Sequence, residues 1–231
     1  MRHIHRAADR GHTTTGWLDS WHTFSFGQFY DRERMGFGPL RVINEDRVAP
    51  GGGFGTHGHA NMEILTWVIS GALQHRDSLG NGSVIRPGEL QRMSAGSGIE
   101  HSEFNASPSE PVHFLQIWIQ PNRSNARPGY AQKTFATAVN GQLVAIASPD
   151  GANGAIPVLA DATLFAADLA PGAAVAHTST SPRLWVQVVS GALVANGEAL
   201  ASGDGLALRG EQALSLQTDA GAQVLVFELP D

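Results

Sequence analysis

The chain contains 231 residues with 27 glycines, 12 prolines and no cysteine, and its formal net charge is −6. Without cysteine it forms no disulfide bond and offers no thiolate ligand. No apolar run approaches the roughly twenty residues of a membrane helix, and no secretory leader is recognisable, so we expect a cytoplasmic protein that binds no membrane. The acidic balance also argues against direct binding of nucleic acid.

Charge and histidine are unevenly divided along the chain. Residues 1–135 hold thirteen Lys or Arg, twelve Asp or Glu and nine of the ten histidines, whereas residues 136–231 hold two, nine and one, respectively. This contrast predicts two domains, 1–135 and 136–231, with the chemistry in the first and residues 129–138 as part of the connection. Because two such modules can pack on one another, we expect a monomer.

Short apolar or alternating runs, separated by Gly, Pro, Asn and Asp, predict an all-β sandwich or barrel. Helical periodicity is scarce. Residues 77–82 are expected to form a hairpin loop. We expect strands at 40–48, 62–70, 84–93, 112–119, 142–147, 163–169, 184–190, 192–196, 206–209, 213–217 and 223–229.

Two pairs of potential metal ligands have the i, i+2 spacing that places both side chains on one face of a strand: His57 with His59, and His101 with Glu103. On facing strands these pairs form a metal cage. Three imidazoles and one carboxylate suit divalent Fe, Mn, Co, Ni, Cu or Zn, and they leave two positions of a six-coordinate ion open. The glycines around the first pair allow the backbone to bend closely around an ion.

Other histidines are interpreted as ordinary residues. His3 and His5 repeat the spacing at a polar N-terminus, but they have no partner pair. His22 and His75 are expected to be surface or hydrogen-bonded histidines. The run Arg32–Arg34 is interpreted as a solvated loop.

The order of the ligand candidates resembles the cupin superfamily, whose motifs read G-x5-H-x-H-x3-E and G-x5-P-x-G-x2-H-x3-N. The matching residues are Gly51, His57, His59 and Glu63 in the first motif, and Gly98, His101 and Asn105 in the second. Gly96 replaces the motif's proline and Leu90 its first glycine, so the entry to the second motif must turn differently.

The flanking sequence resembles the pirin branch of the cupins over residues 17 to about 120. The segments that carry this resemblance are Trp21–Phe26, Gly36–Asp46, Met62–Ile64 and Met93–Glu103. It implies that the metal ligands are His57, His59, His101 and Glu103. It also implies a bicupin of two antiparallel β-sandwich or barrel modules, similar to a jelly roll.

Glu63 is the alternative carboxylate ligand. Most cupins use the carboxylate at its place, and residues 57, 59 and 63 share strand parity, so both carboxylates could point inward. We favour Glu103 because it lies two residues from His101, and we expect Glu63 to support the ligands or the fold.

An internal repeat supports two modules, because Val68–Leu73 aligns with Val188–Leu193 at an offset of 120 residues. At this offset His177 corresponds to His57, but Ser179 replaces His59, and no His-x-Glu follows Gly203. The second module is therefore expected to lack a metal site, with His177 as an ordinary loop or strand-end histidine.

The resemblance also implies a reaction, since bacterial pirins are similar to quercetin 2,3-dioxygenases, which open the central ring of a flavonol with O2 and release carbon monoxide. The expected partners are a flavonol-like aromatic substrate and O2. Fe(II) is the first choice of ion, with Ni, Co, Mn, Cu and Zn as alternatives. In this hypothesis the flavonol 3-hydroxyl loses its proton to Glu103 and ligates the metal, and the electron-rich ring then reacts with O2.

Two other functions stay open at this point. The chain also resembles eukaryotic pirins, which implies a metal-binding, redox-responsive protein that contacts a regulatory partner without turnover. A storage or structural metal site is the third interpretation. For an aromatic substrate, the possible pocket walls are Phe24, Phe26, Phe54, Met93 and Phe104, and the competing interpretation places these side chains in the core.

Overall fold

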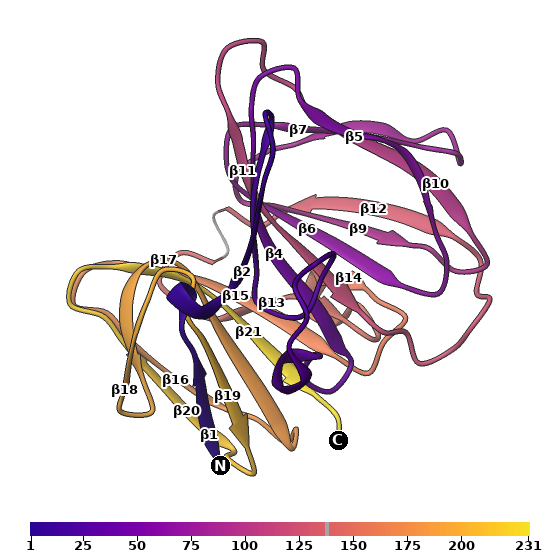
Figure 1. Ribbon diagram of the computed structural model, residues 1–231. Coiled ribbons are helices and arrows are strands. Elements are labelled where there is room, and N and C mark those ends of the chain that lie inside the picture. The colour runs from indigo at the N-terminus through magenta and orange to yellow at the C-terminus, as the bar shows by residue number, and fades with distance from the viewer. Residues whose placement is uncertain (137–138) are drawn as a thin grey trace.

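Three β-sheets make up the computed structural model, which describes residues 1–136 and 139–231 (Figure 1). The helices of the described residues are single 3-10 turns at Ala7–Asp9, Arg32–Arg34 and Ala152–Gly154. The predicted all-β class is confirmed. Within these residues no helix is long and apolar enough to cross a membrane.

The N-terminal module consists of two sheets that face each other (Figure 1). The larger sheet has the order β12 (Gly129–Thr134), β9 (Glu89–Ser94), β6 (Glu63–Ser70), β11 (Val112–Ile119), β4 (Leu40–Val48), β3 (Leu18–His22) and β2 (Gly11–Thr14). The smaller sheet has the order β5 (Gly53–His59), β10 (Ile99–Asn105), β7 (Leu73–Asp77) and β8 (Gly82–Ile85).

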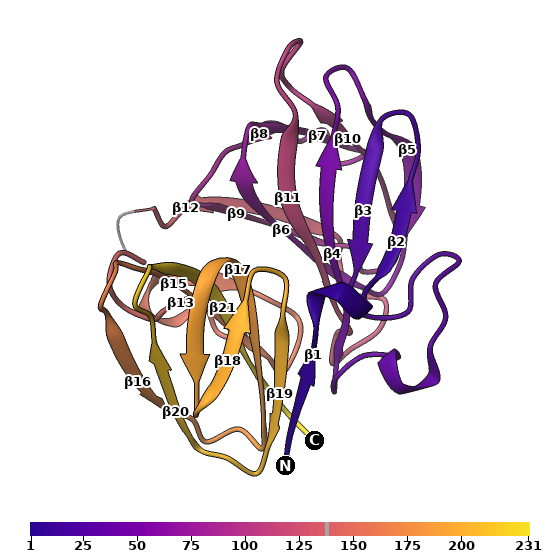
Figure 2. The ribbon, with the colours of Figure 1, turned by 60° about the vertical axis from the view of Figure 1, so that its left-hand side comes forward.

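The C-terminal module is one ten-stranded sheet that folds over itself (Figure 2). Its main path is β1 (Arg2–His5), β19 (Gly205–Arg209), β17 (Arg183–Ala195), β21 (Ala222–Leu229), β15 (Thr163–Leu169), β13 (Val144–Ser148) and β14 (Ile156–Pro157). Off this path lie β16 (Ala174–Thr178), β18 (Glu198–Ala201) and β20 (Ala213–Gln217). The long β17 belongs to both layers, because its first half pairs with β19 and its second half with β18.

The first strand crosses from one module to the other. β1 pairs with β19 over Arg2 to His5, although the chain then returns to the N-terminal module through β2. Residues 1–5 therefore lie in the second module's sheet. Part of the expected connection, residues 137–138, lies outside the described residues. The rest of it differs from expectation: Gly129–Thr134 is the edge strand β12, whose polar, half-exposed side chains hide the alternation of a strand.

Several predicted strands match closely, and others divide differently. The strands at 40–48, 112–119, 163–169 and 213–217 have the expected bounds. The run 84–93 is interrupted by Pro87 and Gly88, where a φ of +79° turns the chain between β8 and β9. The runs 184–190 and 192–196 form the single strand β17.

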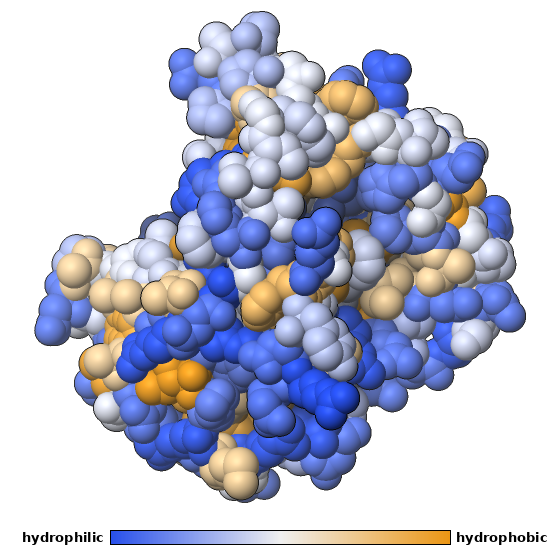
Figure 3. Space-filling view, in the orientation of Figure 1, coloured by the Kyte–Doolittle hydropathy of each residue, from blue (hydrophilic) through white to orange (hydrophobic). Residues whose placement is uncertain are grey.

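The largest apolar core lies between the two modules. It joins residues of the larger N-terminal sheet to residues of the C-terminal sheet, including Leu65, Trp67, Ile117, Trp185 and Phe227. Figure 3 shows, on one face of the molecule, hydrophobic residues in separate patches among hydrophilic ones. Because so much apolar surface is buried between the sheets, the modules form one packed body.

The internal repeat has the same backbone geometry in both modules. Gly71 has a φ of +78° and Gly191 a φ of +77°. A Cβ atom on Gly71 would lie 2.6 Å from the Pro111 carbonyl oxygen, and one on Gly191 would lie 2.2 Å from the Gly221 carbonyl oxygen. Both positions therefore require glycine for conformation and for space.

Candidate metal centre

The three histidines of the predicted cage meet on two neighbouring strands. In the antiparallel pair of β5 and β10, His57 lies opposite His101, and His59 lies opposite Ile99. The register shifts between His101 and Glu103, so that Glu103 lies opposite Phe54. This irregularity follows the glycine-rich start of β5, which has few side chains to hold a regular ladder.

The histidine rings are close enough to share one ion. Their centroids are 4.4 Å apart for His57 and His101, 4.8 Å for His57 and His59, and 5.0 Å for His59 and His101. Nitrogen atoms of the three rings lie within 4.8 Å of one another. The three histidines can therefore hold a metal ion.

Hydrogen bonding prepares His57 to act as a ligand through Nε2. Its Nδ1 lies 2.8 Å from the Gly55 carbonyl oxygen, which can only accept a hydrogen bond, so Nδ1 carries the proton. The lone pair is then on Nε2, which lies 3.1 Å from Nε2 of His101. Such a bond on the distal ring nitrogen is the usual way to orient a metal-binding imidazole.

Burial keeps the other two histidines neutral. It lowers the pKa of His59 to about 4, and the neighbouring His57 lowers it further. Burial also lowers the pKa of His101 to about 3, with contributions from His57 and His59. Metal ions bind the neutral imidazole, so the cluster is ready to ligate at neutral pH.

Glu103 is completely buried beside this cluster, where one carboxylate oxygen is held and the other is not. Oε2 accepts a hydrogen bond of 2.8 Å from Nε2 of Gln116, whose own oxygen accepts one from Thr66. Oε1 is buried without a hydrogen-bond partner among the described residues. Burial raises the pKa of Glu103 to about 7, Gln116 opposes this, and Asp46 adds to it. An unpaired buried oxygen of this kind fits a metal ligand or a proton carrier.

His75 lies next to Glu103, although it was interpreted as an ordinary histidine. Of the two expected alternatives the structure shows the hydrogen-bonded one: His75 is fully buried, and its Nε2 lies 3.2 Å from Oδ2 of Asp77. It is the cross-strand partner of Glu103 on β7, and it forms a second possible ligand group with His101 and Glu103. The available sequence signal was the spacing of His75 two residues after apolar Leu73, which puts both side chains on one face of a strand.

Glu63 points to the other side of the sheet. Its Oε2 accepts hydrogen bonds from Ser94 and from the Leu159 backbone N–H, which lies in the C-terminal half. The parity argument fails because the chain turns between β5 and β6 at Asn61, whose φ is +52°. Glu63 therefore links the modules through these bonds.

The remaining histidines named from the sequence lie elsewhere. His5 is buried against Phe24 and Trp185 between the modules. His177 lies within β16, and its Nε2 is 2.8 Å from Glu228. Neither belongs to a group that could hold a metal among the described residues.

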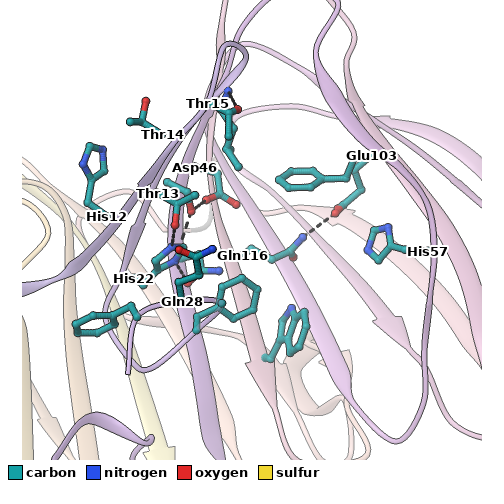
Figure 4. A pocket seen from close by; sticks show the side chains of 18 of the residues that line it. His12, Thr13, Thr14, Thr15, His22, Gln28, Asp46, His57, Glu103 and Gln116 are labelled. Atoms are coloured by element: carbon teal, nitrogen blue, oxygen red, sulfur yellow. Dashed lines mark hydrogen bonds between the residues drawn. The ribbon is translucent and has the colours of Figure 1, made fainter. Parts of the chain in front are cut away.

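A cavity of about 790 Å³ opens beside the histidines, and Figure 4 shows its lining side chains. Phe26 and Phe54 line it as expected. Phe24 and Met93 belong to the core instead, because they are 1% and 0% exposed, and Phe104 is half-exposed outside the cavity. The sequence reasoning missed the aromatic wall Trp118 and the polar residues of β3, β4 and β11 that complete the lining: Ser20, His22, Asn44, Asp46 and Gln116. His22 is the hydrogen-bonded histidine of the two expected alternatives, and it is buried.

Comparison with known proteins agrees with this architecture. The pirin family matches residues 4–119, and the quercetinase C-terminal cupin domain matches residues 145–229. A quercetin 2,3-dioxygenase of Escherichia coli (strain K12) is 46% identical over 231 residues, covering 100% of this chain and 99% of that protein.

Solved structures are equally similar. A crystal structure of YhhW from Escherichia coli has a TM-score of 0.95 and 45% identity, covering 100% of this chain and 98% of that chain. The bacterial pirin YhhW in complex with nickel(II), also from Escherichia coli, has a TM-score of 0.94 and 46% identity, covering 100% and 99%. The chain therefore belongs to the pirin family and is built from two cupin domains.

Proposed function

We propose that the protein is a metal-dependent dioxygenase of the quercetin 2,3-dioxygenase type, which opens the central ring of a flavonol with O2 and releases one ring carbon as carbon monoxide. The observation that carries this proposal is the meeting of three imidazoles and a buried carboxylate at the wall of an aromatic-lined cavity. The 46% identity to a quercetin 2,3-dioxygenase supports it.

The ligands we propose are His57, His59, His101 and Glu103, and the ion we propose is Fe(II), with Ni, Co, Mn, Cu and Zn as alternatives. The donor set fits such an ion, because burial keeps His59 and His101 neutral and Glu103 has an unpaired buried oxygen. A divalent metal held there supplies open coordination positions and a Lewis acid for an oxygen donor. The nickel(II) complex of the Escherichia coli pirin supports a site for a first-row transition metal.

Glu103 is the residue that we propose accepts the proton of the flavonol 3-hydroxyl. Gln116 holds its Oε2, so the unpaired Oε1 is the atom that would bind the ion or, when released from it, receive the proton. Thr66 fixes the Gln116 amide in turn by donating to its oxygen over 3.0 Å. This chain of hydrogen bonds keeps Glu103 in one orientation while its protonation state changes.

The cavity walls orient a flat substrate and exclude water from the reacting ring. Trp118 stands edge-on to His59 with ring centroids 5.0 Å apart, and Phe26 stands edge-on to Trp118 at 5.6 Å. Phe54 lies on β5, in the smaller sheet, whereas Trp118 lies on β11, in the larger one. Aromatic walls on several sides bind a planar ring system through its faces and edges.

The test is anaerobic reconstitution with each metal in turn, followed by quercetin and O2, with carbon monoxide, O2 and flavonol measured together. We expect equimolar consumption of flavonol and O2 and release of carbon monoxide. His59→Gln should abolish this turnover, whereas the matched control His177→Gln should retain it. If no metal form consumes flavonol, the enzyme proposal is wrong, and oxidation-dependent capture of a partner protein would then favour the regulatory alternative.

A further inference from the structure

The cavity has a second group of polar side chains on strands that carry none of the proposed metal ligands. In the pairing of β3 with β4, Ser20 lies opposite Asp46 and His22 lies opposite Asn44. The two residues on each strand are separated by two positions, so all four side chains share one face. That face lines the cavity. Figure 4 shows Asp46 and His22 among the side chains that line the pocket.

Hydrogen bonds inside this group fix its geometry. The Ser20 hydroxyl donates to Oδ1 of Asp46. Nδ1 of His22 lies 2.9 Å from Oδ1 of Asn44, and Nε2 of His22 lies 2.9 Å from the Thr13 hydroxyl. Both ring nitrogens of His22 are therefore engaged, and the Asn44 amide is oriented with its oxygen toward His22.

Two polar atoms are left over after these bonds. Neither Oδ2 of Asp46 nor Nδ2 of Asn44 has a hydrogen-bond partner among residues 1–136 and 139–231, although each residue is only 4% exposed. Neither atom is among the enclosed unpaired atoms of the described residues, so both remain accessible to a ligand in the cavity. Their position in the cavity lining means that a ligand can satisfy both.

The two free atoms have complementary hydrogen-bonding roles. Burial raises the pKa of Asp46 to about 7, so above that pH its free oxygen accepts. The Asn44 amide donates, and a phenolic hydroxyl can both donate and accept at once. An ammonium group could only donate, so it would leave the Asn44 N–H unpaired. The neighbouring walls are the aromatic rings of Phe26 and Trp118, which suit a ring that carries the hydroxyl.

We propose that Asn44 and Asp46 form a hydroxyl-recognition site, which binds a phenolic hydroxyl of the substrate at the cavity wall formed by β3 and β4. This inference rests on the proposed function, because it takes the ligand to be a flavonol whose 3-hydroxyl is at the metal centre. The site narrows the proposed substrate class. Flavonols that carry hydroxyl groups away from the 3-position should bind more tightly than flavonols that carry only the 3-hydroxyl.

The test compares two ligands on metal-free protein, so that binding is measured without turnover. Quercetin carries remote hydroxyl groups, whereas 3-hydroxyflavone carries only the 3-hydroxyl. We expect isothermal titration calorimetry to show that the unmodified protein binds quercetin about tenfold or more tightly than 3-hydroxyflavone, the size of a hydrogen bond to a charged group.

Substitutions at the site should remove this preference. Asp46→Asn and Asn44→Ala should each lower the affinity ratio by about five- to tenfold, with the affinity for 3-hydroxyflavone nearly unchanged. The control Asp168→Asn makes the same chemical change at an exposed residue of β15 and should keep the ratio. Thermal melting of each variant checks folding. If Asp46→Asn does not fold, the proposal is tested by the affinity ratio of the Asn44→Ala variant and by that of the unmodified protein.

Three results would overturn the site: a ratio near one in the unmodified protein, an unchanged ratio in both folded variants, or equal weakening of both ligands. The dioxygenase proposal fails separately. Absence of carbon monoxide release by every metal form, together with a quercetin preference that depends on Asp46, would leave the hydroxyl site in place. Turnover of flavonol without a preference for quercetin would support the dioxygenase proposal and reject the hydroxyl-recognition site.

Discussion

The two modules share a sheet order but differ in what their interiors hold. The N-terminal order β12-β9-β6-β11-β4-β3 corresponds to the C-terminal order β1-β19-β17-β21-β15-β13. Inside the first module lies the polar cavity with its histidines. The second is filled by an apolar cluster that includes Leu184, Val186, Leu206, Leu214 and Leu216.

The difference comes down to a few inward-facing positions on a pair of neighbouring strands. In the first module β5 and β10 present His57, His101 and Glu103 to the interior. In the second, the pair of β16 and β20 presents Leu214 and Leu216, each 1% exposed. The corresponding strand pairs therefore form a candidate metal site in the N-terminal module and an apolar core in the C-terminal module. The chemistry depends on the side chains that these strands carry rather than on the fold.

The largest expected effect is loss of metal from the N-terminal module alone. His101→Ala removes one of three converging imidazoles, and we expect metal affinity to fall by more than about 100-fold, beyond the effect of losing a group that only orients a ligand. Elemental analysis after dialysis measures the bound ion. The matched variant His177→Ala should keep full metal content, and equal losses in both would break the comparison.

The largest loss of stability should instead come from a substitution in the core of the C-terminal module. Leu216→Ala opens a cavity in the filled interior of the second module and should cost about 2–5 kcal/mol of unfolding free energy without loss of metal. Glu103→Gln should change stability by less than about 1 kcal/mol, because it removes a buried charge and keeps the bond to Gln116. It should still lower metal affinity. Urea denaturation in chelator checks both, and a reversed order of the two costs would contradict this assignment.

Lowering the pH should reduce the free energy of unfolding, because His5, which β1 buries between the modules, is protonated more readily in the unfolded chain. Burial lowers the pKa of His5 to about 4, with smaller contributions from His3 and Arg34. Between pH 6.5 and 4 the unfolded chain binds a proton at this histidine and the folded chain does not, so stability falls as the pH falls. The loss should reach about 3 kcal/mol.

His5→Phe tests this by removing the titrating group. The difference in unfolding free energy between the unmodified protein and the variant should change between pH 6.5 and 4 and stay constant above pH 7. A difference that does not vary with pH would show that His5 is not the group responsible.

Replacing the repeat glycines should destabilise both modules alike. Gly71→Ala and Gly191→Ala each place a Cβ on a positive φ and against backbone atoms, and we expect each to cost about 1–3 kcal/mol. Gly82→Ala is the control, because a Cβ there has no described atom within 4 Å. Chemical denaturation measures all three. A large cost at only one of the two repeat positions would mean that the modules do not use the turn in the same way.

Prediction from the sequence worked where the side-chain pattern is local. The strands β4, β11, β15 and β20 alternate or are continuously apolar, so their bounds could be stated in advance. The polar strands β2 and β12 carry no such signal, and their pairing with β3 and β9 depends on partners elsewhere in the chain. The parity argument for Glu63 failed for a local reason, the left-handed turn at Asn61.

The amino-acid sequence by itself determined the all-β class, the repeat of two modules and the residues of the histidine cluster, because strand periodicity, glycine turns and i, i+2 spacing are properties of neighbouring residues. Only the tertiary structure decided that β1 joins the second module, that His75 lies beside Glu103, and that Asn44 and Asp46 face the cavity of the histidines. Those contacts join residues distant in the chain, and their positions follow from how the sheets pack rather than from any local pattern.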